Sequence, residues 1–516
     1  MKSLDPVELS LFASRVDSVC GEMGVQLARS AFSPNIRDRL DFSCALFDAD
    51  GRLCAQAAHI PVHLGSMAYA MADIVAGIRW APGDMVMLND PFLGGTHLPD
   101  VTVVAPLFAD DRLVAFVANR AHHADIGGES PGSMPLSRSL HDEGILIPPG
   151  HIVRCGELDR ARLDEITGAT RNPRDARGDF AAQIGANRRG LDRLGDLVNA
   201  MGVDTWLAAV AQLNDYGARL AWDALGAIPD GRFAFEDFMD DDGLGHEDIP
   251  IRVSIERRSD HVLVDFSGTA RQVSGNINCP LSVTAAGVLY AMRCLMPAQT
   301  PACAGTFEPV RLKVPEGSLL NAVRPAAVAA GNVETSTRVV DVVLGALARA
   351  MPARIPAASH GSMNNVAMGT AGVRPWGYYE TLGGGMGAGR HGGGLSAVQT
   401  HMTNTRNTPI EVLESRYPIR VRRYAVRRGS GGAGARPGGD GLLRSYEFLA
   451  DARFTLLTER RRRAPWGLEG GRDGASGINR LNDEVLPPKV SGEARRGDVL
   501  TIETPGGGAY GAVRQG

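Results

Sequence analysis

The chain has 516 residues, too many for one ordinary hydrophobic core, so we expect about two or three intimately packed domains. Hydrophobic residues make up 44% and charged residues 22%, as in ordinary globular proteins, and the formal net charge of -4 gives no general attraction to nucleic acid or to an anionic membrane. Seven cysteines, an odd number without Cys-x2-Cys spacing, argue against a disulfide framework and against a cysteine-type zinc site.

The N-terminal segment begins MKSLDPVELS and lacks the basic and apolar regions of a signal peptide. No later stretch reaches the roughly 18 apolar residues that cross a bilayer. We therefore expect a cytoplasmic protein without a membrane partner. Asp5, Pro6 and Glu8 have the pattern of an N-cap, a first-turn proline and a capping-box glutamate, which predicts a helix from here towards Ser30.

Two β-hairpins are predicted in the segment that follows. Alternating apolar residues flank a turn within 41–56, and a second alternating pair flanks the turn at 109–111 within 101–123. Between them lie a helical pattern at 67–79 and a strand at 83–90. The intervening loop NDPFLGGTHLPD therefore joins two predicted strands.

Helical and strand patterns alternate irregularly through the rest of the chain. Residues 154–228 and 333–350 have helical periodicity, whereas 251–268 alternate like a strand. Glycine then dominates three segments, which predicts positive φ angles or close backbone approach at 383–394, 429–441 and 504–511.

These patterns favour an α+β (mixed α/β), multi-domain protein with mixed sheets, helical segments and glycine-rich loops in the C-terminal third, because regular βαβ alternation is absent. We place an N-terminal α/β region with the candidate metal residues at 1–153. A mainly helical region follows at 154–249, and a C-terminal α/β region with glycine-rich loops at 250–516.

Histidine and aspartate are concentrated in the N-terminal region. His97 and Asp100 lie three residues apart in the NDPFLGGTHLPD loop, His122 ends the second predicted hairpin, and Asp41 opens the first. Two imidazoles and two carboxylates suit Zn²⁺, Mn²⁺ or Fe²⁺ better than Ca²⁺, which prefers oxygen ligands throughout. These four residues are therefore a candidate divalent-metal site.

Two alternatives stay open for this group. His97 and Asp100 can simply cap the turn that the glycine pair and Pro99 produce. His122 and the adjacent His123 point to opposite faces of an extended segment, so only one of them should be a ligand. The other would orient a neighbouring group or the substrate.

Recognised phosphate-binding loops are missing from the sequence. There is no Gly-x4-Gly-Lys-Ser/Thr motif, and the glycine spacing within 383–394 neither follows a clean strand nor opens a helix. The letters GESPG at 128–132 match a nucleophile elbow, but Pro131 removes a backbone N–H that an oxyanion hole needs. Any ATP dependence would thus need another subunit.

A second polar cluster, THMTNTRNTPIEVLE, spans 400–414. It is either a densely hydrogen-bonded loop or a loop that presents donors to a partner or a substrate. Arginines are frequent from 416 onwards and end in ERRRR at 459–463. Balancing acidic residues and the lack of interleaved aromatics favour an ion-paired face over a nucleic-acid site.

Long blocks follow one another in a single order nearly from end to end: RDRLDFSCALFD (37–48), HIPVHLGSM (59–67), NDPFLGGTHLPDVTVVAPLF (89–108), ANRAHHADIGGESPGSMP (118–135), DFSGTARQVSGNINCP (265–280), GNVETSTRVVDVVLGAL (331–347), HMTNTRNTPIEVLE (401–414), RRRAPWGLEGG (461–471) and TPGGGAYG (504–511). In these blocks the chain resembles the hydantoinase B/oxoprolinase family. That family includes B-type subunits of N-methylhydantoinases, the matching half of 5-oxoprolinase, and subunits of acetone and acetophenone carboxylases.

The resemblance implies a divalent metal (Zn, Mn or Fe) at Asp41, His97, Asp100 and His122, with His123 as the reserve ligand. It also implies an A-type partner subunit that binds ATP and Mg²⁺ and activates a lactam, cyclic imide or ketone, so that the enzyme is a hetero-oligomer. Asn35, Asp38 and residues 302–305 depart from the family pattern, which leaves the substrate open.

From the resemblance we expect an enzyme, the catalytic B-type subunit of an ATP-dependent amidohydrolase that opens a hydantoin, 5-oxoproline or similar lactam ring. The alternatives are a subunit of an ATP-dependent ketone carboxylase and a non-catalytic structural partner of the A-type subunit. His123, Asp125 and His63 are the candidates for proton transfer.

Overall fold

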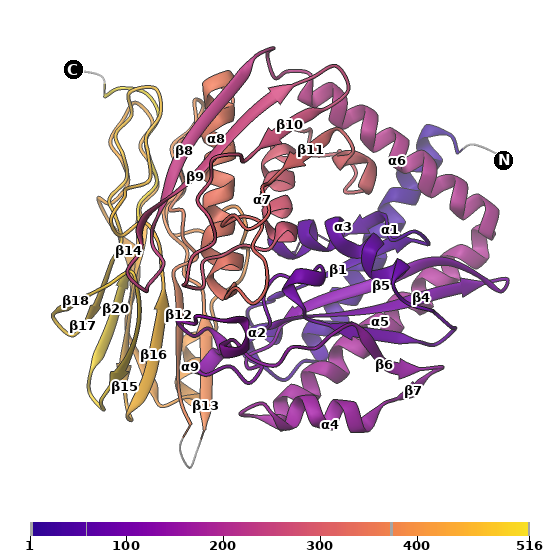
Figure 1. The fold of residues 1–516 in the computed structure, drawn as a ribbon, viewed down its shortest axis with the longest axis horizontal. Helices are drawn as coiled ribbons and strands as arrows, with labels where there is room; N and C mark the ends of the chain where they lie inside the picture. Colours follow the sequence, from indigo (N-terminus) through magenta and orange to yellow (C-terminus); the bar gives the residue numbers. More distant parts are fainter. Residues whose placement is uncertain (1–3, 58, 372–374, 514–516) are drawn as a thin grey trace.

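The computed structural model describes residues 4–57, 59–371 and 375–513, and these form a mixed α+β, multi-domain protein (Figure 1). The predicted fold class is confirmed. Within the described ranges, the strands form four sheets of seven, four, four and five strands. The two C-terminal sheets lie at the left of Figure 1, and the seven-stranded sheet lies at the lower right.

The seven-stranded sheet contains both predicted hairpins, and all its pairings are antiparallel. Its strand order is β2-β1-β5-β4-β3-β6-β7. The strands are β1 (Phe42–Asp48), β2 (Leu53–Gln56), β3 (Met85–Leu88), β4 (Asp100–Ala109), β5 (Arg112–His122), β6 (Gly150–Arg154) and β7 (Glu157–Leu158).

Helices cover both faces of this sheet because its central strands are apolar on both sides. Along β4, Val103 belongs to the core shared with α1, α5 and α6, whereas Val104 belongs to the core shared with α3. The predicted capping box at Asp5 and Glu8 is present at the start of α1. The helices of this part are α1 (Pro6–Ser30), α2 (Pro34–Arg37), α3 (Pro61–Ala76), α4 (Arg160–Gly168), α5 (Pro173–Met201) and α6 (Val203–Leu225).

A four-stranded sheet in the order β11-β10-β9-β8 packs against α7 and α8 in a second core. A π-helical turn, η5 (Gly331–Thr335), leads directly into α8. The elements are β8 (Arg232–Asp241), β9 (Glu247–Arg257), β10 (Val262–Asp265), β11 (Val310–Lys313), α7 (Leu281–Arg293) and α8 (Ser336–Ala350). The short turns are η1 (Pro91–Leu93), η2 (Pro131–Ser133), η3 (Leu140–Asp142) and η4 (Ala304–Phe307).

Two antiparallel sheets form the C-terminal part, in the orders β13-β12-β16-β19 and β14-β15-β20-β17-β18. Their inner faces share one apolar core. The elements are β12 (Asn365–Thr370), β13 (Trp376–Glu380), α9 (Ile410–Arg416), β14 (Ile419–Arg427), β15 (Gly441–Phe448), β16 (Ala452–Leu457), β17 (Ile478–Leu481), β18 (Glu484–Leu486), β19 (Lys489–Ala494) and β20 (Val499–Glu503).

The three glycine-rich segments pack against one another, backbone to backbone. Gly385 donates to Pro505 O, Gly439 donates to Met386 O, and Gly507 donates to Gly439 O. A Cβ on Gly385 would come within 2.0 Å of Gly439 O. The three segments therefore need glycine because their backbones approach closely. The sequence had predicted either this or positive φ angles.

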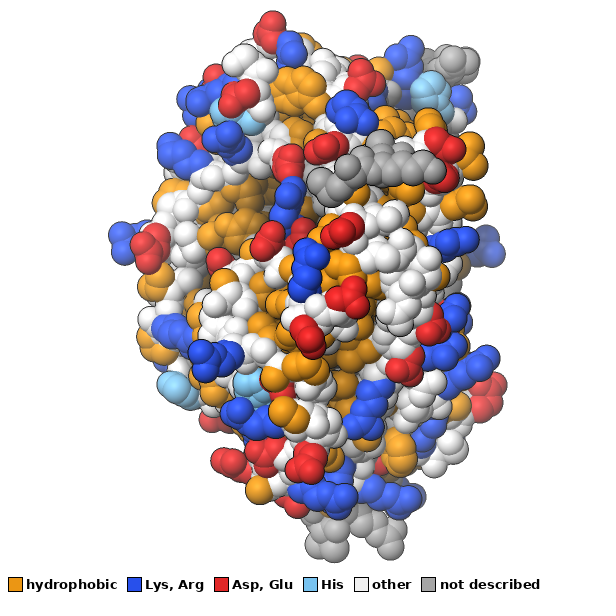
Figure 2. All heavy atoms as spheres, turned by 90° about the vertical axis from the view of Figure 1, so that its right-hand side faces the viewer, with side chains coloured by type: hydrophobic (Ala, Val, Ile, Leu, Met, Phe, Trp, Pro, Cys, Tyr) orange, Lys and Arg blue, Asp and Glu red, His pale blue; other side chains and the backbone are white. Residues whose placement is uncertain are grey.

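Some predicted boundaries are displaced. The helix expected at 67–79 begins at Pro61, which occupies its first turn. The region expected to be helical from 154 opens with the short hairpin β6–β7 instead. Among the described residues, no helix combines the length and hydropathy needed to cross a membrane. On the face drawn in Figure 2, acidic and basic side chains are interspersed with apolar patches, without a single-sign field.

Candidate metal centre

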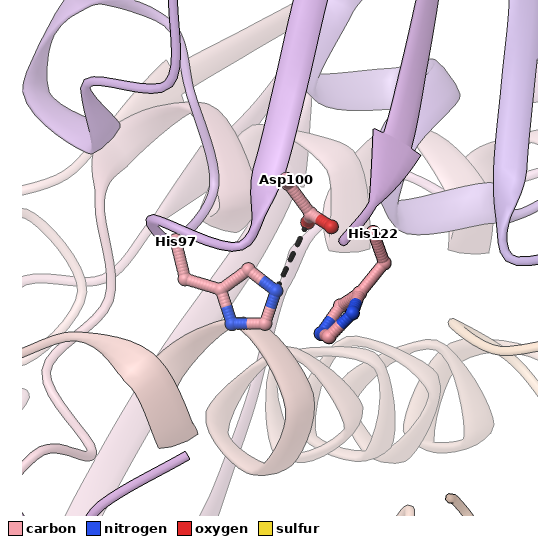
Figure 3. Close-up of side chains that lie close together, drawn as sticks. All are labelled: His97, Asp100 and His122. Atoms are coloured by element: carbon pink, nitrogen blue, oxygen red, sulfur yellow. Dashed lines mark ion pairs between the residues drawn. The ribbon is translucent and has the colours of Figure 1, made fainter. Parts of the chain in front are cut away.

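His97, Asp100 and His122 converge in the interior of the protein (Figure 3). Each offers one ligand atom, and these atoms all lie within 4.8 Å of one another. His97 Nε2 is 3.2 Å from Asp100 Oδ2, and the two imidazole rings meet edge to face with centroids 5.0 Å apart. We call these three residues the donor cluster. All three are buried.

The β4–β5 hairpin aligns two members of the donor cluster. Asp100, the first residue of β4, is paired directly with His122, the last residue of β5. Directly opposed residues of an antiparallel pair project from the same face, so the register brings the carboxylate and the imidazole together.

The preceding loop folds His97 onto the same place. Gly94 has a φ of 91°, a left-handed conformation that suits glycine. A Cβ on Gly95 would lie 2.6 Å from Asp90 O, so the chain turns tightly here. Asp100 N donates to His97 O at 3.1 Å, which closes the final turn. The loop thus both forms a turn and delivers a ligand atom.

Asp41 and His63 border the donor cluster on one side. His63 Nε2 is 3.2 Å from Asp100 Oδ2 and 4.0 Å from Asp41 Oδ1. Asp41 also faces Arg39, whose Nη2 is 3.5 Å from Asp41 Oδ2. Asp41, His63 and His122 line one small cavity of about 20 Å³, room for about one water-sized group.

Burial and neighbouring charges set the protonation of the cluster. Burial raises the pKa of Asp41 and lowers that of His122 well below its usual range. Burial also opposes ionisation of Asp100, but His63 and His97 outweigh it and hold the Asp100 pKa well below its usual value. Burial lowers the pKa of His97, and Asp100 more than compensates, so it is raised. The cluster therefore combines an ionised carboxylate with a neutral imidazole at His122.

The hydrogen-bonding state of the buried donor atoms in the cluster suits a metal ligand. Within the described ranges, His97 Nε2, His122 Nε2 and Asp100 Oδ1 are buried without a hydrogen-bond partner. His97 Nδ1 is 3.3 Å from Ala329 O, the usual arrangement in which a ligating histidine donates its other N–H to a carbonyl. His122 Nδ1 lies 3.2 Å from Asn35 Nδ2, and a half-turn of that amide would offer it an acceptor oxygen instead.

His123 and Asp125 lie away from the donor cluster. His123 Nε2 is 2.9 Å from Gln183 Oε1, and its ring stacks on Phe180 with centroids 4.2 Å apart. Asp125 pairs with Arg171 at 2.5 Å. His123 and Asp125 line a different cavity, of about 300 Å³. Of the three residues predicted for proton transfer, only His63 adjoins the cluster. His122 belongs to the donor cluster and His123 does not, because adjacent residues of a strand point to opposite faces of the sheet.

Two residues that the sequence did not single out complete the surroundings. Asn332, in the π-helical turn η5, donates from Nδ2 to Asp100 Oδ2 at 3.2 Å, and its Oδ1 is buried without a partner among the described residues. Tyr379 stacks on His122. The contact between Asn332 and Asp100 joins residues 232 positions apart and has no local signal in the sequence.

The chain matches the family model described as Hydantoinase B/oxoprolinase over residues 5–513. It is 40% identical to 5-oxoprolinase 1 of Arabidopsis thaliana, over 98% of this chain and 42% of that protein. It is 33% identical to a protein of Pseudomonas sp. (strain NS671) that is provisionally named as the B-type subunit of a D-/L-hydantoinase, over 99% of this chain and 90% of that one.

The fold also matches a solved structure. The crystal structure of ATP-dependent caprolactamase from Pseudomonas jessenii superposes with a TM-score of 0.92 at 27% identity, covering 99% of this chain and 92% of that chain. The chain thus spans less than half of the 5-oxoprolinase but nearly all of the hydantoinase subunit and the caprolactamase chain. On this evidence, the chain belongs to the hydantoinase B/oxoprolinase family.

Proposed function

We propose that this chain is the catalytic B-type subunit of an ATP-dependent amidohydrolase that opens a hydantoin, 5-oxoproline or similar lactam ring. The observation that carries the proposal is the buried convergence of His97, Asp100 and His122, whose ligand atoms lie within 4.8 Å of one another. Relatives named for 5-oxoprolinase, hydantoinase and caprolactamase activities support a cyclic amide as the substrate.

His97, Asp100 and His122 would hold a divalent ion (Zn, Mn or Fe), with Asp41 as the fourth ligand on the side of His63. When bound, such an ion supplies a Lewis acid and lowers the pKa of water. The donor set fits because it combines imidazole nitrogen with carboxylate oxygen and keeps its remaining ring nitrogens engaged by Ala329 and Asn35.

The chain's own residues prepare the site for ring opening. Asp100 is held ionised by His63 and His97, so it is ready to act as a ligand without losing a proton. His63 Nε2 lies between the carboxylates of Asp100 and Asp41, where it can accept or return a proton. Apolar side chains of Ile60 and Val62 line the same small cavity and limit the entry of bulk water.

ATP and Mg²⁺ would be bound by an A-type partner, which makes the enzyme a hetero-oligomer. The glycine-rich segments of this chain hydrogen-bond to one another, backbone to backbone, so their glycines are used in packing. A relative whose name describes it as one subunit of a hydantoinase supports such an assembly.

Ring opening tests the activity directly. The chain is co-purified with the A-type protein and supplied with ATP, Mg²⁺, a divalent transition metal and hydantoin, 5-oxoproline or caprolactam. Opening of a ring with release of ADP is expected. Incorporation of bicarbonate into a ketone instead would favour the carboxylase alternative, and a complex without either activity would favour a structural partner.

Elemental analysis tests the metal site separately. Wild-type protein should carry about one ion per chain, and His97→Ala should lose most of it. Equal metal content in the two proteins would refute the assignment of the donor cluster as the metal site.

A further inference from the structure

A second cavity, of about 470 Å³, lies between α3, α7 and the loop 399–404. Thr403 lines both this outer cavity and the small inner cavity of the cluster. Its hydroxyl lies 3.5 Å from that of Thr405, which in turn lies 2.6 Å from that of Thr381. Thr405 and Thr381 also line the inner cavity. Thr403 is therefore the first of three neighbouring hydroxyl groups that lead from the wall of the outer cavity to the wall of the inner one.

The wall of the outer cavity combines apolar surface with unused hydrogen-bonding atoms. Leu289 and Phe307 contribute apolar side chains. Three of the cavity's lining residues, Gln56, His59 and Gln399, each have a buried side-chain atom (Oε1, Nδ1 and Oε1) without a hydrogen-bond partner among the described residues. Apolar lining with a few convergent polar groups is the usual make-up of a small-molecule site, and an unpaired buried polar atom calls for a partner.

The same wall carries almost no free charge. None of its described lining residues is an aspartate or a glutamate. Its one cationic side chain, Arg293, donates to the carbonyl oxygens of Pro297 and Thr300. Burial lowers the pKa of His59 to about 4 and also lowers that of His401, so both are neutral near pH 7. An uncharged ligand with hydrogen-bond donors and acceptors fits such a wall best.

The loop that separates the two cavities is held in an uncommon conformation. His401 has a φ of 58°, in the left-handed region that non-glycine residues seldom adopt. Its ring packs edge to face on Tyr290 of α7, with centroids 5.7 Å apart. Conformations of this kind persist where surrounding contacts enforce them, often at ligand sites.

We propose that the outer cavity is the substrate site, that it binds a small uncharged cyclic amide, and that Thr403 marks the passage from it to the donor cluster. This assignment rests on the proposed function. Under this assignment, the polar loop at 400–414 presents hydrogen-bond donors to a substrate, which is one of the two interpretations that the sequence left open.

A third cavity, larger than the outer one, is a weaker candidate. It measures about 820 Å³, but it contains the carboxylates of Asp73 and Glu316 and shares no lining residue with the inner cavity.

Filling the outer cavity tests the proposal. Asn404 is an exposed lining residue, so Asn404→Trp adds bulk to the cavity without disturbing a core. The matched control, Val485→Trp, places the same side chain on β18, where Val485 is 59% exposed. Binding of hydantoin and of caprolactam to the metal-loaded full chain is measured by ligand-observed NMR, and metal content is measured in parallel.

We expect Asn404→Trp to weaken binding at least tenfold with unchanged metal content, and Val485→Trp to bind like wild type. Unchanged binding by Asn404→Trp, or no binding of either ring to wild type, would overturn the proposal. Turnover measured with the A-type protein distinguishes failure of the cavity assignment from failure of the proposed function. If rings are opened but Asn404→Trp leaves KM unchanged, the cavity assignment fails alone. If binding is lost in Asn404→Trp while wild type opens no ring, the hydrolase assignment fails alone.

Discussion

The imidazole of His122 lies flat against the phenol ring of Tyr379, with centroids 4.9 Å apart and planes inclined by 10°. Tyr379 is fixed in turn by its hydroxyl, which donates to Asn365 Oδ1 at 2.8 Å. Strand β13 thus holds a ring that belongs to strand β5 of a different sheet. The orientation of one candidate ligand depends on the C-terminal part of the chain.

Tyr379→Leu should weaken metal binding by roughly tenfold, because loss of a group that orients a ligand typically costs 10- to 100-fold in affinity. Competition with a chromophoric chelator measures the effect. Tyr379→Phe is the matched control, since it keeps the stacked ring and removes only the hydroxyl. Equal losses in the two variants would show that stacking is not what orients His122.

His63→Gln should lower the turnover number by about 100-fold while metal content is retained, because its Nε2 is the imidazole nitrogen placed between two carboxylates of the site. His123→Gln should leave turnover close to wild type, since His123 is paired with Gln183 in another cavity. Steady-state kinetics with the A-type protein compares the two variants. The reverse order would assign proton transfer to His123.

Glu334 links stability to pH. It is fully buried, and burial, with a smaller contribution from Glu459, raises its pKa from 4.5 to about 7. Between pH 4.5 and pH 7 the folded protein keeps a proton on Glu334 that the unfolded chain has released. The free energy of unfolding is therefore highest below about pH 4.5 and falls as the pH rises through 7. The difference corresponds to roughly 3 kcal/mol above pH 7.

Glu334→Gln should remove this cost, because a neutral amide can still accept from Met363 N and Asn365 Nδ2. Urea unfolding at pH 5 and pH 8 is the measurement, and the variant should gain most at pH 8. Glu484→Gln, an exposed position, serves as the control. A gain that is the same at both pH values would mean that Glu334 is ionised throughout.

The glycine-rich segments give a clean test of backbone packing. Gly385→Ala should destabilise the fold by at least about 2 kcal/mol, because its Cβ would lie 2.0 Å from Gly439 O. Gly389→Ala, in the same segment, has nothing within 4 Å of its added Cβ and should be nearly neutral. Thermal unfolding of both proteins decides the matter. Similar melting temperatures would mean that the segments separate easily.

Local sequence patterns predicted those parts of the site that lie on one hairpin. Strand alternation and the turn at 109–111 predicted the hairpin of β4 and β5, at whose open end Asp100 and His122 lie. Their direct pairing also depends on a register shift between Leu107 and Phe108, which the sequence pattern did not predict. The loop glycines indicated the turn that brings His97 to them. The capping box and first-turn proline likewise located α1 within one residue.

The remainder depended on contacts between distant segments. Asn332, Tyr379 and Thr403 reach the cluster only because the second core and the C-terminal sheets pack against the first sheet, and no local periodicity records such packing. The helix expected at 67–79 began earlier because Pro61 starts a helix well, and His63 lies in that additional first turn. The glycine-rich segments predicted close approach without indicating which segments meet.

The candidate ligands and the residues that orient them come from different parts of the chain, which limits transfer of the site to another protein. A peptide that ends after β5 would contain every candidate ligand, yet it would lack the partners of those ligands in η5, β13 and the loop 399–404. Grafting the hairpin and its loop onto another scaffold would therefore transfer the ligands without the setting that orients them. The proposed metal site therefore depends on the assembled chain and not on the N-terminal segment alone.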